Sequence, residues 1–140
     1  MTISIRSAVV ADEAAVIALW RACDLTAPYN DPASDFRFAR GGPASDILVA
    51  VDANDIVGSI MVGHDGHRGW LYYVAVAPRH RKKRIGRALV KAAEEWLSDR
   101  AVPKVHLMVR ETNAQVVEFY AKIGYDPMPR VNMQKWLKQS

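Results

Sequence analysis

The sequence predicts a single α/β domain over residues 1–140, with a mixed, mostly antiparallel central sheet and helices on both faces. Apolar runs with the two-residue period of strands alternate with segments of helical period. Strands expected at 70–77 and 104–109 flank a long helix, which implies one right-handed parallel crossover. A chain of 140 residues has the length of one domain and can bury a core without disulfides or metal.

The first half of the chain predicts a strand, two helices and a hairpin. Ile3 and Ile5 alternate with polar neighbours, which indicates a strand. Asp12 and Glu13 fall in the first turn of the next segment, where the helix dipole favours acids. Two apolar runs around residues 52–55 predict the hairpin. The expected segments are Thr2–Arg6, Ala11–Ala22 (with Ala14, Ile17, Ala18 and Arg21 at helical spacing), Ser34–Arg40, Asp46–Val51 and Ile56–Val62.

The second half predicts alternating strands and helices. Residues 70–77 have almost no polar side chain, as in a central strand covered on both faces. The clearest helical spacing follows, from Ile85 to Leu97. Asn113 is expected to cap a helix that ends near Lys122, before Gly124 at a position that favours glycine. Further strands are expected at Lys104–Val109 and Val131–Leu137, and the inward residues of the last helix are expected to be Val116, Val117, Phe119, Tyr120 and Ile123.

Composition excludes several classes of protein. Half of the residues are hydrophobic and 24% are charged, which is typical of a globular domain and not of a disordered chain. No apolar run approaches the ~20 residues of a membrane span, so no membrane partner is expected. Cys23 is the single cysteine, expected to be a small buried apolar residue. His64 and His67 are the only pair at ligand-like spacing, so no metal is expected. Without a signal-peptide pattern we expect a reducing, cytoplasmic setting.

The net charge of +4 is unevenly distributed. Segment 12–65 carries nine acidic residues against three arginines, whereas residues 79–87 carry six basic residues in nine positions. A protein that coats nucleic acid would be basic over a wider surface, so nucleic acid is not the expected partner. The six basic residues are Arg79, Arg81, Lys82, Lys83, Arg84 and Arg87.

This basic segment joins the strand at 70–77 to the helix that begins near Ile85. Free backbone N–H groups and the helix dipole attract an anion at such a helix start. Gly86 would let a ligand approach the backbone closely. The segment therefore predicts a phosphate or pyrophosphate site, although charge alone fits a solvated basic turn equally well. It matches neither a Walker loop nor a dinucleotide fingerprint.

With the motifs of the last helix added, nearly the whole chain resembles the GNAT superfamily of acetyl-CoA-dependent N-acetyltransferases. The matching motifs are Val76-Ala77-Pro78, Arg81-x-x-Arg84-x-Gly86, Asn113, and Phe119-Tyr120-x-x-x-Gly124-Tyr125. At a finer level, Arg21-Ala-Cys-Asp-Leu25, Tyr29-Asn-Asp-Pro32 and Asp65-Gly-His-Arg-Gly-Trp70 resemble the YpeA-like bacterial branch, which has no firmly assigned acceptor.

The resemblance implies a GNAT-like domain with a splayed sheet that transfers the acetyl group of acetyl-CoA directly to a primary amine in a ternary complex. It does not decide whether the acceptor is a small molecule or a protein. It also leaves open whether the protein forms a homodimer. Tyr120 would protonate the departing thiolate, and Asn113 would bond the pantetheine. The main chain of Val74, Ala75 and Val76 would line the pantetheine, and the N–H groups of Arg81, Lys82, Lys83, Arg84, Ile85, Gly86, Arg87 and Ala88 would hold the pyrophosphate. Arg84 replaces a family glycine, at a cost of about 1 kcal/mol if its φ is positive.

The general base stays open, because Trp70 stands where many family members have a Glu. His67 is the candidate base, with His64, Asp65 and Glu111 as alternatives and Tyr73 able to order a water. His67 could equally be a surface residue, and Tyr120 a core residue. Asp24, Asp31 and Asp35 could recognise the amine or be solvated only. The alternative functions are a catalytically weak acyl-CoA-binding module and, through residues 79–87, a nucleic-acid-binding protein.

Overall fold

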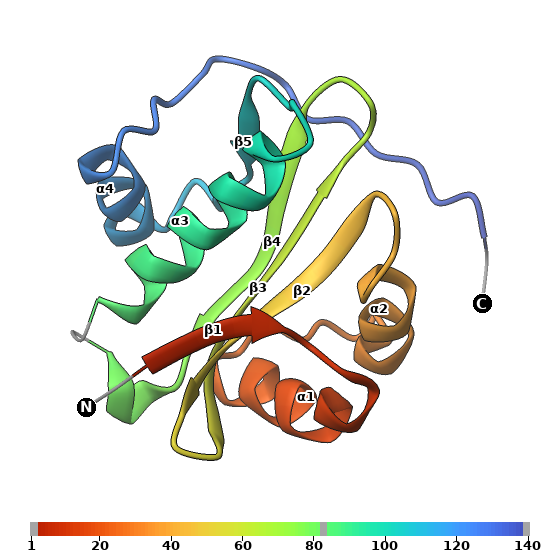
Figure 1. Ribbon diagram of the computed structural model, residues 1–140. Helices are drawn as coiled ribbons and strands as arrows, with labels where there is room; N and C mark the ends of the chain where they lie inside the picture. Colours follow the sequence, from red (N-terminus) through yellow and green to blue (C-terminus); the bar gives the residue numbers. More distant parts are fainter. Residues whose placement is uncertain (1–2, 82–83, 139–140) are drawn as a thin grey trace. The chain divides into compact units, whose positions relative to one another are not determined.

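The computed structural model describes residues 3–81 and 84–138, which divide into an N-terminal unit, Met1–Met108, and a C-terminal unit, Val109–Ser140 (Figure 1). Each unit is described by itself. No helix within the described residues is long and apolar enough to cross a membrane. The N-terminal unit contains β1 (Ile3–Ser7), the 3-10 turn η1 (Val10–Asp12), α1 (Glu13–Ala22), α2 (Pro32–Ala39), β2 (Ser45–Asp52), β3 (Asp55–His64), β4 (Gly69–Val76), the 3-10 turn η2 (Pro78–His80), α3 (Ile85–Ser98) and β5 (Val105–Leu107).

The five strands form one sheet in the order β1-β2-β3-β4-β5. All neighbours pair antiparallel except β4 and β5, which pair parallel across the α3 connection. The predicted mixed, mostly antiparallel sheet is confirmed, as are the hairpin and the parallel crossover. The β4–β5 pairing is short and joins Gly69–Leu71 to Val105–Leu107.

Helices cover both faces of this sheet. The α-carbon of Gly58 faces α3, because an added Cβ would lie 2.9 Å from a Leu89 methyl. The next side chain, Ser59, accepts a hydrogen bond from Trp20 Nε1 of α1 at 2.9 Å. Successive strand residues point to opposite faces, so α1 and α3 lie on opposite sides. Figure 1 shows α2 beside α1.

The helix α1 buries a different stripe from the one expected. The sequence places Ala14, Ala18 and Arg21 on its periodic face, but all three are exposed. The structure buries Val16, Ile17, Leu19 and Trp20. Larger side chains remove more apolar area from water, and Trp20 outweighs the alanines in this respect.

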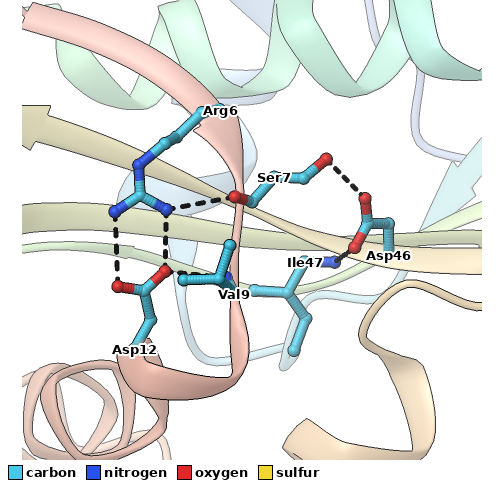
Figure 2. Close-up of polar contacts among 6 residues, drawn as sticks. All are labelled: Arg6, Ser7, Val9, Asp12, Asp46 and Ile47. Atoms are coloured by element: carbon cyan, nitrogen blue, oxygen red, sulfur yellow. Dashed lines mark hydrogen bonds and ion pairs between the residues drawn. The ribbon is translucent and has the colours of Figure 1, made fainter.

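A polar network fixes the chain between β1 and α1 (Figure 2). Arg6 pairs with Asp12 at 2.7 Å, and the Asp12 carboxylate also accepts the Val9 N–H at 2.8 Å. The hydrogen bond from Arg6 holds the pKa of Asp12 below its usual range. Asp46, buried on β2, accepts from Ser7 Oγ at 2.7 Å and from its neighbour's N–H. The Asp12 carboxylate thereby satisfies a backbone donor where the chain leaves β1, and Asp46 holds the side chain of the last residue of that strand.

The C-terminal unit contains one helix, α4 (Ala114–Lys122), within its described residues. Asn113 caps it as predicted, accepting the Val116 N–H at 3.4 Å. Gly124, with φ +100°, ends it in a Schellman motif: the Tyr125 N–H bonds the Tyr120 carbonyl at 3.0 Å. Of the expected inward residues, Val116, Phe119 and Ile123 are half-buried and Tyr120 is buried, whereas Val117 is 36% exposed.

The strand expected at Val131–Leu137 is wrong. The structure has no regular secondary structure in this segment, and Val131, Met133 and Leu137 are exposed. Alternation predicts a strand only where a second strand offers hydrogen bonds, and nothing in the described chain pairs with this one.

Candidate active site

The strand β4 has an unpaired edge over most of its length. Its pairing with β5 stops at Leu71, and no strand of the described chain pairs beyond that point on this side. We call residues 72–76 the open edge. Their backbone groups can bond an extended ligand as a further strand would.

At the end of the open edge, the backbone N–H and carbonyl of Val76 point away from the neighbouring strand β3. The next N–H, that of Ala77, bonds the Val57 carbonyl of β3 at 2.8 Å, so the backbone groups of Val76 face the other way. Accordingly, the Val76 carbonyl accepts from Arg81 Nε and from Cys23 Sγ, each at 3.3 Å. No local pattern predicts that Cys23 lies near this strand, and the residue is half-buried where a buried one was expected.

Tyr73 occupies a strained bulge in the same strand. The register between β3 and β4 shifts between Ser59 and Met61, and Tyr73 has φ +49°, unusual for an aromatic residue. Its ring stacks on Trp20 at 3.9 Å between centroids, and its carbonyl accepts from Ser59 Oγ at 3.2 Å. Strain of this kind persists only where surrounding contacts impose it, as these do.

The Tyr73 hydroxyl connects the bulge to α2. It donates to Asp35 Oδ2 at 2.7 Å. Burial and the Asp35 carboxylate raise the pKa of Tyr73, so the phenol keeps its proton at neutral pH and remains the donor. Asp35 was expected to recognise an amine or to be solvated only; the structure brings it to β4.

The start of α3 follows the open edge after the turn η2. Arg84 is its N-cap residue, with φ +61° and ψ +18°, so the condition under which this arginine carries a strain cost is met. No described side chain caps this helix, and the N–H groups of Ile85, Gly86 and Arg87 have no partner within the helix. Arg84 and Arg87 are both exposed here. An anion would find backbone donors, a helix dipole and cations together.

Two of the expected anion donors are already engaged. The N–H of Ala88 bonds the Arg84 carbonyl at 3.1 Å, and that of Arg81 bonds the Pro78 carbonyl at 3.4 Å. Lys82 and Lys83 lie outside the described residues. The donors that remain open are those of the first turn of α3.

The turn between β3 and β4 holds the candidate base. Asp65 Oδ1 accepts the N–H groups of His67 and Arg68 at 2.9 and 2.7 Å, and these bonds lower the pKa of Asp65. The His67 residue is exposed. It precedes Gly69 at the start of β4, whereas Val76 ends that strand, about 20 Å away at strand rise. The structure therefore does not bring His67 to Val76.

Trp70 stands near this turn and packs against β5. Its ring stacks on His106 at 5.0 Å between centroids. A cavity of about 290 Å³ lies beside it, lined in part by Met61, Asp65 and Tyr72. His64 also lines the cavity, and its Nδ1 accepts the Gly66 N–H at 3.1 Å.

In the C-terminal unit, Tyr120 is 7% exposed and contacts the rings of Phe119 and Tyr125 edge-on. Burial raises the pKa of Tyr120 to about 12. The Schellman motif gives the Tyr120-x-x-x-Gly124-Tyr125 spacing a structural reason of its own, because the residues three before and two after the C-cap contact each other there. Glu111 is exposed.

The fold and the site define an acyltransferase of the GNAT type: a β4 edge left open by a short β5, followed by an anion-attracting helix start. The sequence matches the acetyltransferase (GNAT) family over residues 14–125, and the chain belongs to that family. An acetyltransferase from Pectobacterium atrosepticum is 43% identical over 126 residues, covering 90% of this chain and 89% of the relative. One from Sodalis glossinidius is 44% identical over 111 residues, covering 79% of this chain and 78% of the relative.

Solved structures agree on the fold. AAC(6')-Iy, in complex with the bisubstrate analogue CoA-S-monomethyl-acetylneamine, gives a TM-score of 0.84 at 13% identity, covering 97% of this chain and 99% of that one. Glucosamine-6-phosphate N-acetyltransferase from Arabidopsis thaliana gives 0.76 at 23% identity, covering 99% of this chain and 100% of that one. At such identities the likeness concerns the fold alone.

Proposed function

We propose that this acetyltransferase moves the acetyl group of acetyl-CoA directly to a primary amine. The observation that carries the proposal is the continuity of the open edge with the start of α3. Arg81 belongs to the connection between them and bonds the Val76 carbonyl. Coenzyme A has a matching order of groups: an amide-bearing arm that can pair with a strand, then phosphates that suit a helix start.

Each part of the site has a proposed task toward acetyl-CoA. The outward backbone groups of Val74 and Val76 would pair with the pantetheine arm, and Ala75, whose own groups face β3, would lie between them. The N–H groups of residues 85–87 and the side chains of Arg84 and Arg87 would hold the pyrophosphate. Acetyl-CoA supplies an activated acetyl group when it is bound.

The chemistry requires a donor for the oxyanion and a proton for the departing thiolate. The arm runs from the phosphates at the start of α3 back along β4, so the thioester end lies nearer Val74 than Val76, and the outward N–H of Val74 is the proposed oxyanion donor. Tyr120 is the proposed acid, because a phenol with a pKa of about 12 is protonated at neutral pH. Asn113, whose Oδ1 caps α4, keeps its amide N–H₂ for the pantetheine. We do not extend the role of base to His67, because it lies at the opposite end of β4.

Direct transfer is favoured over a route through Cys23. Its Sγ hydrogen-bonds the Val76 carbonyl at 3.3 Å, so attack on a thioester would first have to break that bond. Cys23→Ser should therefore retain acetyl transfer, and loss of transfer together with acetylated Cys23 in the wild type would contradict direct transfer.

The proposal is tested by a thermal-shift titration and an acceptor screen. CoA and acetyl-CoA should raise the melting temperature, because a ligand of the native state stabilises it by mass action. Replacing Gly86 with valine should remove most of that shift. A screen of amines that follows thiol release should then find an acceptor. No shift at millimolar CoA would contradict the whole proposal.

A catalytically weak acyl-CoA-binding module is the second candidate. Trp70, stacked on His106, leaves no carboxylate at the position where many family members have one. CoA binding with an intact thioester across a broad amine panel would favour this candidate.

A further inference from the structure

Asp35 holds a half-buried carboxylate whose second oxygen is unused. Oδ2 accepts the Tyr73 hydroxyl, whereas Oδ1 has no hydrogen bond within the described part of the chain. No Lys, Arg or His of the described residues forms an ion pair with Asp35. The nearest candidate on its own helix, Arg37, is bound in two places by Glu13 at 2.8 Å.

This carboxylate is also held in one orientation. The Tyr73 ring is fixed by the stack on Trp20, whose indole N–H bonds Ser59, and Ser59 in turn bonds the Tyr73 carbonyl. Tyr29 adds a further hydroxyl near Tyr73. Tyr73 belongs to β4. The residue that positions Asp35 therefore lies on the same strand whose open edge we assign to acetyl-CoA.

A half-buried carboxylate with one oxygen unbonded can accept a further hydrogen bond from a cation, and such charge-assisted bonds are stronger than neutral ones. The connection between α1 and α2, residues 23–31, carries two further acids, Asp24 and Asp31, and no basic residue in its sequence. Solvent reaches Asp35, so a ligand can as well.

We infer that Asp35 is the residue that binds the acceptor, through an ion pair with the ammonium group of a primary amine, and that Tyr73 positions its carboxylate. The inference rests on the proposed acetyl transfer and names its acceptor class: amines that are cationic at neutral pH. The ammonium would bond Oδ1 while Tyr73 keeps Oδ2, and it must lose one proton to solvent before the neutral amine attacks the thioester carbon. A neutral analogue of the same shape would lose this ion pair.

The test uses n-pentylamine as the cationic probe and 1-pentanol as its neutral counterpart, titrated calorimetrically with and without CoA. Asp35→Asn keeps an oxygen for the Tyr73 hydroxyl but removes the charge. It should weaken n-pentylamine binding by about tenfold or more, the range of a hydrogen bond to a charged group. Binding of 1-pentanol and of CoA should not change.

Asp24→Asn is the matched control, because it removes the same charge from a residue with φ +58°, which asparagine adopts readily. It should change n-pentylamine binding by less than about threefold, because Asp24 is exposed and its charge is screened by solvent and salt. Tyr73→Phe should keep the ring stack and weaken binding by an intermediate factor.

The outcomes separate the two proposals. Failure of CoA to bind would contradict the proposed function. The Asp35 assignment would be overturned if n-pentylamine does not bind the wild type, if Asp35→Asn has no effect, or if Asp24→Asn weakens binding equally.

Discussion

Replacing Arg84 with glycine should stabilise the free protein while weakening CoA binding. Arg84 has φ +61° at the start of α3, a conformation that costs a side-chain-bearing residue roughly 1–2 kcal/mol. Glycine removes this strain but gives the unfolded chain more freedom, worth about 0.4–1 kcal/mol. The net gain is about 0.5–1 kcal/mol. At about 2.1 cal/mol/K per residue, this raises the melting temperature by roughly 2–3 °C.

The same substitution removes one of the cations at the helix start. We expect CoA affinity to fall by roughly three- to tenfold, about 0.7–1.4 kcal/mol, and the loss to shrink as salt is added. Arg87→Gly is the matched control: it removes the same charge inside the first helical turn, where glycine costs about 1 kcal/mol. It should lower the melting temperature while also weakening CoA. Calorimetric melting gives the melting temperature of both variants, and titration gives their CoA affinity. A lower melting temperature for Arg84→Gly than for the wild type would refute the strain argument.

Three further predictions concern the proposed acid and two polar networks. Tyr120→Phe should lower kcat by ~10²-fold or more with CoA affinity unchanged, because it deletes a proton donor and keeps the ring. Steady-state kinetics with a verified acceptor measure this, and an unchanged kcat would mean that Tyr120 is only a core residue. Asp12 has a lowered pKa in the folded state, so its contribution to stability is complete above its unfolded pKa of about 3.9 and is lost as pH falls through the lower folded value. Asp12→Asn should therefore flatten the acid limb of the stability–pH curve, and an unchanged limb would remove the Arg6 pair as its cause. Ser59→Ala should destabilise by about 1–3 kcal/mol in urea unfolding, because the buried Trp20 N–H loses its acceptor; a cost near zero would contradict that bond.

Local patterns predicted most elements of the N-terminal unit. Strand alternation, the spacing of Ile85–Leu97 and the Asn113 cap depend on residues close in sequence, so they can be recognised without a structure. The basic turn was recognised for the same reason, whereas a positive φ at Arg84 was only considered, through the resemblance to a family with glycine there. The strand predicted at 131–137 is absent from the structure. Alternation does not show whether another strand is available to pair.

The contacts around β4 could not be predicted in this way. Trp20, Ser59 and Tyr73 meet across separations of 39 and 14 residues. Cys23 reaches the Val76 carbonyl from 53 residues away. Neither the bulge at Tyr73 nor its bond to Asp35 leaves a local pattern, since each depends on how α1 and α2 pack on the sheet. His67 shows the converse: its residue type suits a base, but the hairpin places it at the other end of β4.

Amide hydrogen exchange with and without CoA reports on the backbone groups that we assign to acetyl-CoA. We expect slower exchange on CoA binding at Val74, Val76 and residues 85–87. Exchange at Ala77, whose N–H already bonds β3, should change little. Binding of CoA with no added protection at the open edge or at the first turn of α3 would contradict the account.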